Sequence, residues 1–283
     1  QYNNQCYILA GYIVERVTGK TYEQCLQVYL FDPLGMGRSC AFLDDIEGDA
    51  DHATPYDRTD TSDALHGMRP IPFYRTPVED RAKGIGAAMG PAGSIDSCAA
   101  DMLKWVQFHL NHGAWEGKQL ISEDSMQQMH RPNMILNAPL DMPMPETDFW
   151  SYGMGWFIES FRGHKLIQHG GNINGFSGFT SFMPDLNLGV VAYTNMNGSY
   201  LHYALGREII DHYLGIEDGN WVQRYHDFVA GRSANAAKQI LAMTGEQVPG
   251  TSPSHPMADY TGTFCREGYT PAVVTEENGA LYL

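Results

Sequence analysis

The apolar positions near the start of the chain recur at the spacing of an α-helix. Over residues 6–18 they are Cys6, Ala10, Ile13, Val14 and Val17. This spacing places them on one side of a helix. Gly19 follows, and a glycine there allows the left-handed conformation that commonly ends a helix. The pattern therefore predicts a first helix over residues 6–18.

The next apolar positions predict a second helix, with Thr21 at its N-cap. Thr21 and Gln24 have the spacing of a capping box. The side chains that we expect to face inward are Tyr22, Leu26, Tyr29 and Leu30. Pro33 and Gly35 follow, and these residue types end the predicted helix.

Residues 40–92 show no clear periodicity and hold many Asp, Gly and Pro residues. Long irregular segments inside a compact domain often line a functional cleft. The segment ends at Gly90-Pro91-Ala92-Gly93, to which we assign packing and the shape of the cleft. Two helices are predicted after it: one capped by Ser97 and closed by Gly113, and a shorter one over residues 122–130.

From residue 151 the pattern becomes that of β-strands. Strands are predicted over residues 152–158, 165–169, 178–183 and 188–194. Pro184-Asp185 forms the turn between the last two. Helical patterns return over residues 199–214 and 220–231. Helices followed by consecutive antiparallel strands, and then by helices, indicate an α+β fold.

The composition changes again near residue 249. Residues 249–254 are Pro-Gly-Thr-Ser-Pro-Ser, which is typical of a linker. Beyond them, residues 260–264 and 273–274 alternate as strands, with a turn at residues 277–279. We therefore expect one domain over residues 1–248 and the first strands of a C-terminal β-barrel-like domain over residues 249–283.

Charge and composition narrow the possible partners. The formal net charge of −15 argues against nucleic acid, because phosphate binding needs Lys and Arg gathered on one face. No apolar run reaches the ~20 residues that span a bilayer. The five cysteines form no cluster with His, so we expect no metal site and partly buried, reduced thiols. Cytoplasmic and periplasmic locations both remain open.

Two motifs carry candidate chemistry. The first is Tyr2-Asn3-Asn4 at the start of the first helix, followed in order by Thr18-Gly19-Lys20 and Pro33-Leu34-Gly35-Met36. The second is His169-Gly170-Gly171, which ends an apolar strand and is followed by Asn172. Glycines in a strand allow another backbone to approach closely. We expect the two motifs to border one cleft, with the Tyr2 hydroxyl facing His169.

In this order the motifs resemble the serine β-lactamase and penicillin-binding-protein-like family, which includes class C β-lactamases, related esterases and D-amino-acid peptidases. The resemblance implies a β-lactamase/transpeptidase-like antiparallel sheet flanked by helices. It also implies attack on an ester or amide through an acyl-serine, without a metal or organic cofactor. The implied substrate is a small molecule or is peptide-like.

The resemblance also implies roles for individual residues. Tyr2 takes part in proton transfer, and Asn4 offers its amide to the substrate. His169 stands where β-lactamases have the Lys of a Lys-Thr-Gly motif, and Gly170-Gly171 borders the substrate. The backbone N–H of Asn172 matches one donor of the oxyanion hole. An imidazole is mostly neutral at pH 7, so we expect a preference for neutral esters or peptide-like amides.

The family's nucleophile lies in a Ser-x-x-Lys motif upstream of the tyrosine, and this motif does not occur in the 283 residues. We therefore expect a fragment that lacks the N-terminal part of its domain and is inactive alone, with the motif on a missing segment or a second chain. The alternative is a non-catalytic relative that binds peptidoglycan or D-amino-acid peptides. The sequence upstream of Gln1 would distinguish the two.

We assign no catalytic or metal-binding role to several other polar residues. Ser177 follows the glycines closely, and we expect it to be a turn hydroxyl. The pair Asp44-Asp45, and His202 with His212, lack metal-ligand spacing. We expect all four to be solvated.

Overall fold

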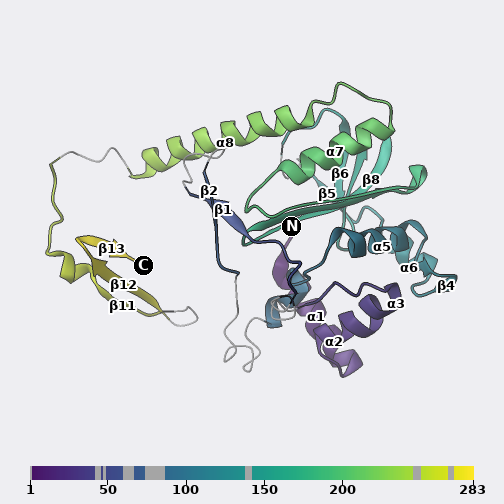
Figure 1. The fold of residues 1–283 in the computed structure, drawn as a ribbon, viewed down its shortest axis with the longest axis horizontal. Helices are drawn as coiled ribbons and strands as arrows, with labels where there is room; N and C mark the ends of the chain where they lie inside the picture. Colours follow the sequence, from purple (N-terminus) through teal and green to yellow (C-terminus); the bar gives the residue numbers. More distant parts are fainter. Residues whose placement is uncertain are drawn as a thin grey trace. The chain divides into compact units, whose positions relative to one another are not determined.

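The computed structural model describes residues 2–41, 46, 49–59, 67–73, 87–137, 142–244, 250–266 and 271–283. The chain divides into two compact units, Gln1–Ala234 and Asn235–Leu283. Helices and an antiparallel sheet build the first unit (Figure 1), so the predicted α+β class is confirmed. The two units divide within helix α8, Trp221–Thr244. The domain boundary at residue 248 stays a prediction.

A six-stranded antiparallel sheet in the order β10-β9-β8-β7-β6-β5 forms the centre of the first unit. The strands are β5 Met134–Leu136, β6 Thr147–Tyr152, β7 Phe157–Phe161, β8 His164–Ile173, β9 Phe176–Met183 and β10 Leu188–Thr194. The predicted hairpin is confirmed, with Leu188 opposite Met183. The single strand predicted over residues 152–158 is wrong. Gly155 has a φ of 80°, which suits a turn rather than a strand, and this turn separates β6 from β7.

Side chains alternate between the two faces of the sheet, and each face is covered by a helix (Figure 1). Helix α5, Ala99–Leu110, covers one face, and α7, Leu201–Tyr213, covers the other. Glycines allow both helices to approach closely. A Cβ at Gly189 would lie 2.2 Å from Val106 of α5, and a Cβ at Gly206 of α7 would lie 2.4 Å from Phe179. These close contacts set the positions of α5 and α7 relative to the strands of the sheet.

The N-terminal helices begin and end where the sequence predicts. Helix α1, Asn4–Thr18, is capped by the side chain of Asn3 and ends at Gly19 with a φ of 67°. Thr21 and Gln24 form the predicted capping box of α2, Tyr22–Leu26. A π-helical turn, Gln27–Phe31, then leads into α3, Asp32–Leu34.

The inward faces of these helices were predicted less well. A π turn takes an extra residue per turn. The side chains within and after it therefore point in other directions than in a continuous α-helix. Tyr29 is consequently 58% exposed, whereas Phe31 and Leu34 are buried. Much of the apolar side of α1 is also exposed, with Val17 at 80%. The buried residue of α1 is Gly11, which packs directly against Pro91.

The remaining elements of the first unit are short. The segment predicted to be irregular contains two paired strands, β1 Tyr56–Arg58 and β2 Met68–Pro70, and the 3-10 helix Ala87–Ala92. The pair β3 Ala114–Trp115 and β4 Lys118–Gln119 follows α5. The cap of α5 is Cys98 rather than Ser97. Helix α6, Glu123–Met129, is capped by Ser122, and the 3-10 turn Pro184–Leu186 joins β9 to β10.

The second unit contains the predicted C-terminal strands. They are β11 Gly262–Phe264, β12 Ala272–Glu277 and β13 Ala280–Tyr282, preceded by the 3-10 helix Met257–Tyr260. Asn278 and Gly279 form the turn between β12 and β13, both with positive φ. Among the described helices of both units, none combines the length and apolar character that crossing a membrane requires.

Candidate active site

Tyr2, just before α1, lies close to His169 in the middle of β8, although the two are far apart in the sequence. The expectation that His169 ends its strand is wrong, because β8 continues to Ile173. The ring centroids of Tyr2 and His169 are 6.0 Å apart. Tyr2 also packs edge-on against Tyr152, with centroids 5.6 Å apart, and lies 6.2 Å from Phe157. The expectation that Tyr2 and His169 border one cleft therefore agrees with the structure.

Beyond Gln168, no described strand pairs with β8 on the side away from β9, so this edge is open in the described part of the chain. Strand β7 pairs with β8 only from His164 to Gln168, whereas β9 pairs with it as far as Ile173. The hairpin between β8 and β9 closes on Ile173 opposite Phe176. A two-residue turn closes on a hydrogen-bonded pair, and such pairs alternate with non-bonded ones. By this alternation Gly170 and Asn172 direct their backbone groups away from β9, toward the open edge.

A pocket of about 310 Å³ lies beside this edge. Tyr2, His169 and Tyr152 line one part of it, and residues 90–93 line another. The cleft-shaping role expected for the Gly90-Pro91-Ala92-Gly93 segment agrees with this position. A Cβ at Gly171 would meet nothing within 4 Å. The strand end is therefore accessible to a bound molecule.

Both ring nitrogens of His169 have hydrogen-bond partners. Nδ1 lies 2.6 Å from the carbonyl oxygen of Gly170, which can only accept, so Nδ1 carries a proton. In the neutral ring Nε2 is then an acceptor, and the Tyr152 hydroxyl, 3.2 Å away, donates to it. Tyr7 lies 2.7 Å from the Tyr152 hydroxyl and donates in turn. The contacts thus select one tautomer of a neutral imidazole.

The electrostatics of the site keep these groups neutral. Burial lowers the pKa of His169, although its bond to the Gly170 carbonyl works in the opposite direction. Burial and the neighbouring Tyr7 raise the pKa of Tyr2. Burial and the hydroxyl of Tyr7 raise the pKa of Tyr152 far above its usual value. With the groups described, Tyr2 is therefore a phenol at neutral pH and cannot accept a proton.

The side chain of Asn172 braces the loop that follows β10. Its Oδ1 accepts hydrogen bonds from the Ser177 hydroxyl, at 2.7 Å, and from the backbone N–H of Gly198. Its Nδ2 donates to Asn197 at 2.9 Å. Ser177 is buried and its hydroxyl also lies 2.8 Å from the Met196 carbonyl. Ser177 therefore lies in β9 rather than in the turn where we expect it, and its hydroxyl bonds within the fold.

Gly170 is needed where β8 meets helix α7. A Cβ at this position would lie 1.9 Å from the hydroxyl oxygen of Tyr203, a residue of α7. Such a distance is impossible without movement of one of the two. Tyr203 therefore supports the site strand from the face opposite His169.

The sequence model of the Beta-lactamase family matches residues 1–213. The chain belongs to the beta-lactamase family. Among its relatives is Unguisins hydrolase ungD of Aspergillus violaceofuscus. The two sequences are 32% identical over 95% of this chain and 48% of the relative. The chain spans about half the length of the curated relatives it matches.

Solved structures similar to this beta-lactamase family chain share its fold. The octameric penicillin-binding protein homologue of Pyrococcus abyssi is 25% identical, with a TM-score of 0.61 over 76% of this chain and 43% of that one. The D-amino acid amidase of Ochrobactrum anthropi SV3, solved with D-phenylalanine, is 20% identical, with a TM-score of 0.51 over 76% and 61%. The predicted family and the β-lactamase/transpeptidase-like fold are thus confirmed.

Sequence reasoning missed the aromatic neighbours of the two beta-lactamase motifs. Tyr7 falls within the predicted first helix and Tyr152 at the start of a predicted strand, and no local pattern marks either residue. Asn4 is exposed as the first residue of α1 and does not line the pocket. The catalytic and binding roles assigned to Tyr2, Asn4, His169, Gly170, Gly171 and Asn172 stay predictions.

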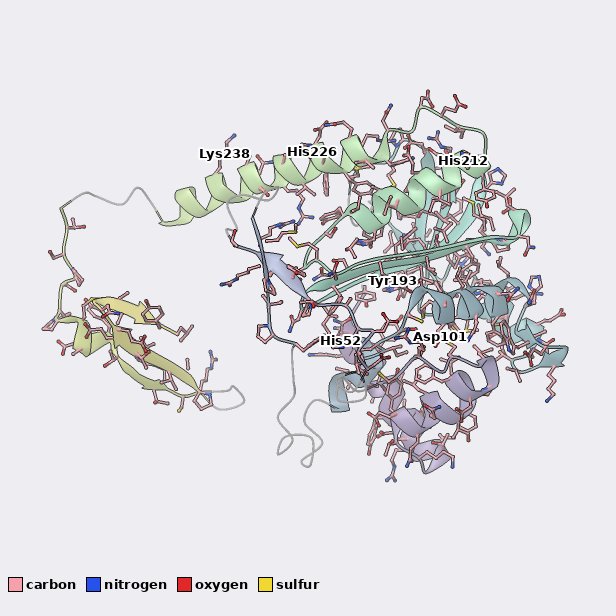
Figure 2. All side chains as sticks on the ribbon, viewed as in Figure 1. His52, Asp101, Tyr193, His212, His226 and Lys238 are labelled. Atoms are coloured by element: carbon pink, nitrogen blue, oxygen red, sulfur yellow. The ribbon has the colours of Figure 1, made fainter. Side chains whose placement is uncertain are left out.

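We expect both His202 and His212 to be solvated, and for His202 this expectation is wrong. His202 is 2% exposed because it occupies the side of α7 that faces the sheet, whereas His212 is exposed, as expected (Figure 2). Asp44-Asp45 lies outside the described residues. The described part of the chain holds no group of three or more His, Cys, Asp or Glu side chains placed to bind a metal.

Proposed function

We propose that this chain supplies the tyrosine and the substrate-binding strand of a serine hydrolase that cleaves an ester or amide through an acyl-serine. The contact between Tyr2 and His169 at the open edge of β8 carries this proposal. The nucleophile comes from a Ser-x-x-Lys sequence outside the 283 residues, on another segment or a second polypeptide. The family's hydrolytic relatives support the reaction class.

The open edge of β8 supports an oxyanion role for Asn172. By the alternation of hydrogen-bonded pairs its backbone N–H points away from β9, where no strand is paired with it among the described residues. A backbone N–H aimed at the reacting carbonyl stabilises the negative charge that develops on its oxygen. The bonds from Ser177 and Gly198 to the Asn172 side chain hold this residue in place.

The raised pKa of Tyr2 fits a site that still needs a cation. A phenol becomes an effective base only when a neighbouring positive charge favours the phenolate. In this proposal the Lys of Ser-x-x-Lys supplies that charge. Tyr2 then accepts the serine proton as the serine oxygen bonds to the substrate carbonyl, and returns it to the leaving group. Water releases the acyl group afterwards.

Neutral His169 favours uncharged substrates. Its Nδ1–H is engaged by Gly170 and its Nε2 by Tyr152, so the ring offers neither a charge nor a free donor to a substrate carboxylate. A Lys at this position would offer both. We therefore propose neutral esters and peptide-like amides as substrates, with poor turnover of penicillins. The amide class also agrees with the D-amino acid amidase among the similar structures.

The test compares the isolated chain with a full-length form that includes Ser-x-x-Lys. A fluorophosphonate probe should label the full-length protein and leave the isolated chain unlabelled. Tyr2→Phe in the full-length protein should reduce kcat/KM by roughly 10²–10⁴-fold, as loss of a general base does. Tyr12→Phe is the matched control, because Tyr12 is 56% exposed on α1, the helix that follows Tyr2. Equal effects of the two substitutions would contradict the role of Tyr2.

Labelling of the isolated chain would instead refute the placement of the nucleophile outside it. A full-length protein that binds D-amino-acid peptides but reacts with no probe would favour the alternative, a non-catalytic binding relative.

A further inference from the structure

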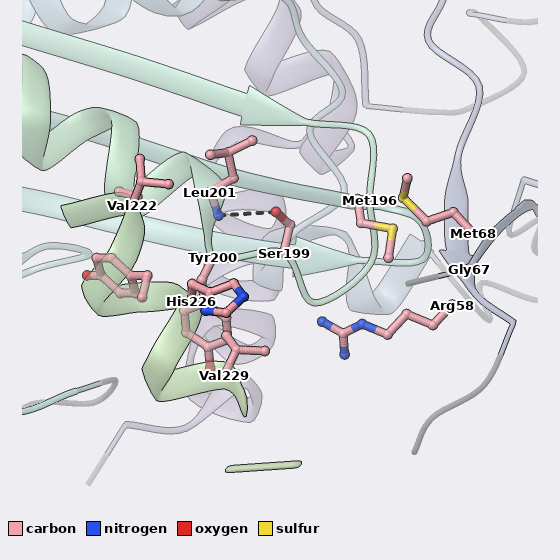
Figure 3. Close-up of a pocket in the computed structure, with 12 residues that line it drawn as sticks. Arg58, Gly67, Met68, Met196, Ser199, Tyr200, Leu201, Val222, His226 and Val229 are labelled. Carbon is pink, nitrogen blue, oxygen red and sulfur yellow. Dashed lines mark hydrogen bonds between the residues drawn. The ribbon is translucent and has the colours of Figure 1, made fainter. Parts of the chain in front are cut away.

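A second pocket, of about 300 Å³, lies in the first unit where strands β1 and β2, the loop after β10 and helices α7 and α8 meet (Figure 3). None of the residues that line it also lines the pocket beside Tyr2. Its volume is at the lower end of the roughly 300–1,000 Å³ of pockets that hold small organic ligands. It is therefore a separate candidate site.

The walls of this second pocket are mainly apolar. The apolar lining comes from Met68, Met196, Leu201, Val222 and Val229. Tyr200 and Tyr225 add aromatic surface. The described residues that line it include no Asp or Glu. A ligand with an apolar body would be favoured here, and a negative charge would meet no opposing carboxylate on the lining.

Arg58 is the one permanently charged side chain among these lining residues. It extends from β1, and its guanidinium points toward Tyr200 and His226 across the pocket (Figure 3). Nη2 donates to the Gly198 carbonyl at 3.2 Å, and Nε has no hydrogen-bond partner among the residues that the structure describes. In the part of the chain that the structure describes, Arg58 has no salt bridge to a carboxylate.

An arginine without a carboxylate partner beside an apolar wall has the chemistry of an anion site. A guanidinium presents a planar set of donors that matches both oxygens of a carboxylate. The bond to Gly198 fixes the side chain while Nη1 stays free of any described partner. Val222 and Val229 also line the pocket and leave apolar surface for the rest of the ligand.

We propose that this pocket binds a small apolar carboxylate, with the carboxylate on Arg58 and the hydrocarbon part against α7 and α8. The ligand is of the class of a medium-chain fatty acid or an N-acyl amino acid. The site is independent of the acyl-serine chemistry, because it shares no lining residue with the other pocket. Its test therefore does not depend on the proposed function.

Calorimetric titration of the 283-residue chain with octanoate and with octanol tests this proposal. Octanoate should bind saturably, and Arg58→Gln should weaken it by about tenfold or more, the scale of a lost hydrogen bond to a charged group. Octanol should bind both forms equally. Arg131→Gln is the matched control, since it removes the same charge at an exposed position outside the pocket.

A second variant tests the apolar part of the site independently. Val229→Trp fills space between α8 and the opposite wall, and it should weaken octanoate and octanol alike. Circular dichroism and the thermal midpoint confirm that each variant is folded. Absence of saturable octanoate binding would overturn the proposal, as would equal losses in Arg58→Gln and Arg131→Gln. Octanoate binding that is unaffected by Val229→Trp would place the ligand elsewhere.

Discussion

Acidification should destabilise this chain through His202, a buried histidine that does not line the pocket beside Tyr2. His202 is 2% exposed on α7, and neither of its ring nitrogens has a hydrogen-bond partner among the described residues. Burial lowers its pKa from 6.5 to about 4. A buried imidazole of this kind stays neutral in the folded state while the same group in the unfolded chain takes up a proton.

The sign and size of the effect follow from these two pKa values. The contribution of His202 to stability is fully present above pH 6.5 and is lost as the pH falls toward about 4. At about pH 5 the loss is roughly 2 kcal/mol, from about 1.4 kcal/mol per pH unit. Total stabilities are only about 5–15 kcal/mol, so this loss is measurable.

A buried pair of histidines, His109 and His130, should also lower the stability of the chain on acidification. His109 and His130 are hydrogen bonded at 2.8 Å, and burial lowers the pKa of both. The wild-type chain should therefore lose more stability on acidification than His202 alone explains. Replacing His202 should remove only its own share.

The assay is urea unfolding of the wild type and His202→Leu at about pH 7.5 and pH 5. Fluorescence of the five tryptophans, all of which lie in the first unit, reports its unfolding. The substitution should reduce the stability lost between the two pH values by roughly 2 kcal/mol. His212→Leu, on the exposed side of α7, should leave the loss unchanged. If His202→Leu loses as much as the wild type, His202 is not a buried neutral group.

Three further predictions concern the site strand. Tyr152→Phe removes the donor to His169 Nε2, so the ¹⁵N NMR shift of Nε2 should change while Nδ1 stays protonated; an unchanged spectrum would rule out this bond. Gly170→Ala should cost roughly 1–3 kcal/mol in urea unfolding, because its Cβ would collide with Tyr203, and Tyr203→Phe should recover part of that loss. In the full-length protein His169→Lys should raise kcat/KM for a cephalosporin relative to a neutral nitrophenyl ester; a wild type that already prefers the cephalosporin, with no gain on substitution, contradicts the charge argument.

The sequence predicted helix ends better than helix faces. The capping box at Thr21 and the glycine cap at Gly19 depend on neighbouring residues alone, and both predictions are correct. Which side of a helix is buried depends on distant partners. The π turn at Gln27–Phe31 redirects Tyr29, and no periodic pattern reveals such a turn. The same limit explains His202, whose burial is set by the sheet beneath α7.

The candidate site was predicted from its two motifs, but not the network between them. Tyr2 and His169 could be paired because both belong to motifs with a known order. Tyr7 and Tyr152 come from a helix and a strand whose proximity only the folded chain reveals. The Gly170 carbonyl places the proton of His169 on Nδ1, and the Tyr152 hydroxyl is the partner of Nε2. The complete hydrogen bonding of the ring therefore could not be derived from the motifs.

The aromatic surroundings also give a physical reason for a histidine, rather than a lysine, in the middle of β8. The rings of Tyr2, Tyr152 and Phe157 lie within about 6 Å of the imidazole centroid. A permanently charged amine placed there would lose hydration without gaining a carboxylate partner among the described residues, and such burial is costly. A neutral imidazole avoids this cost and satisfies both nitrogens locally. A charge at this position is therefore costly unless a substrate carboxylate offsets it, and we expect the tyrosine network to favour uncharged substrates.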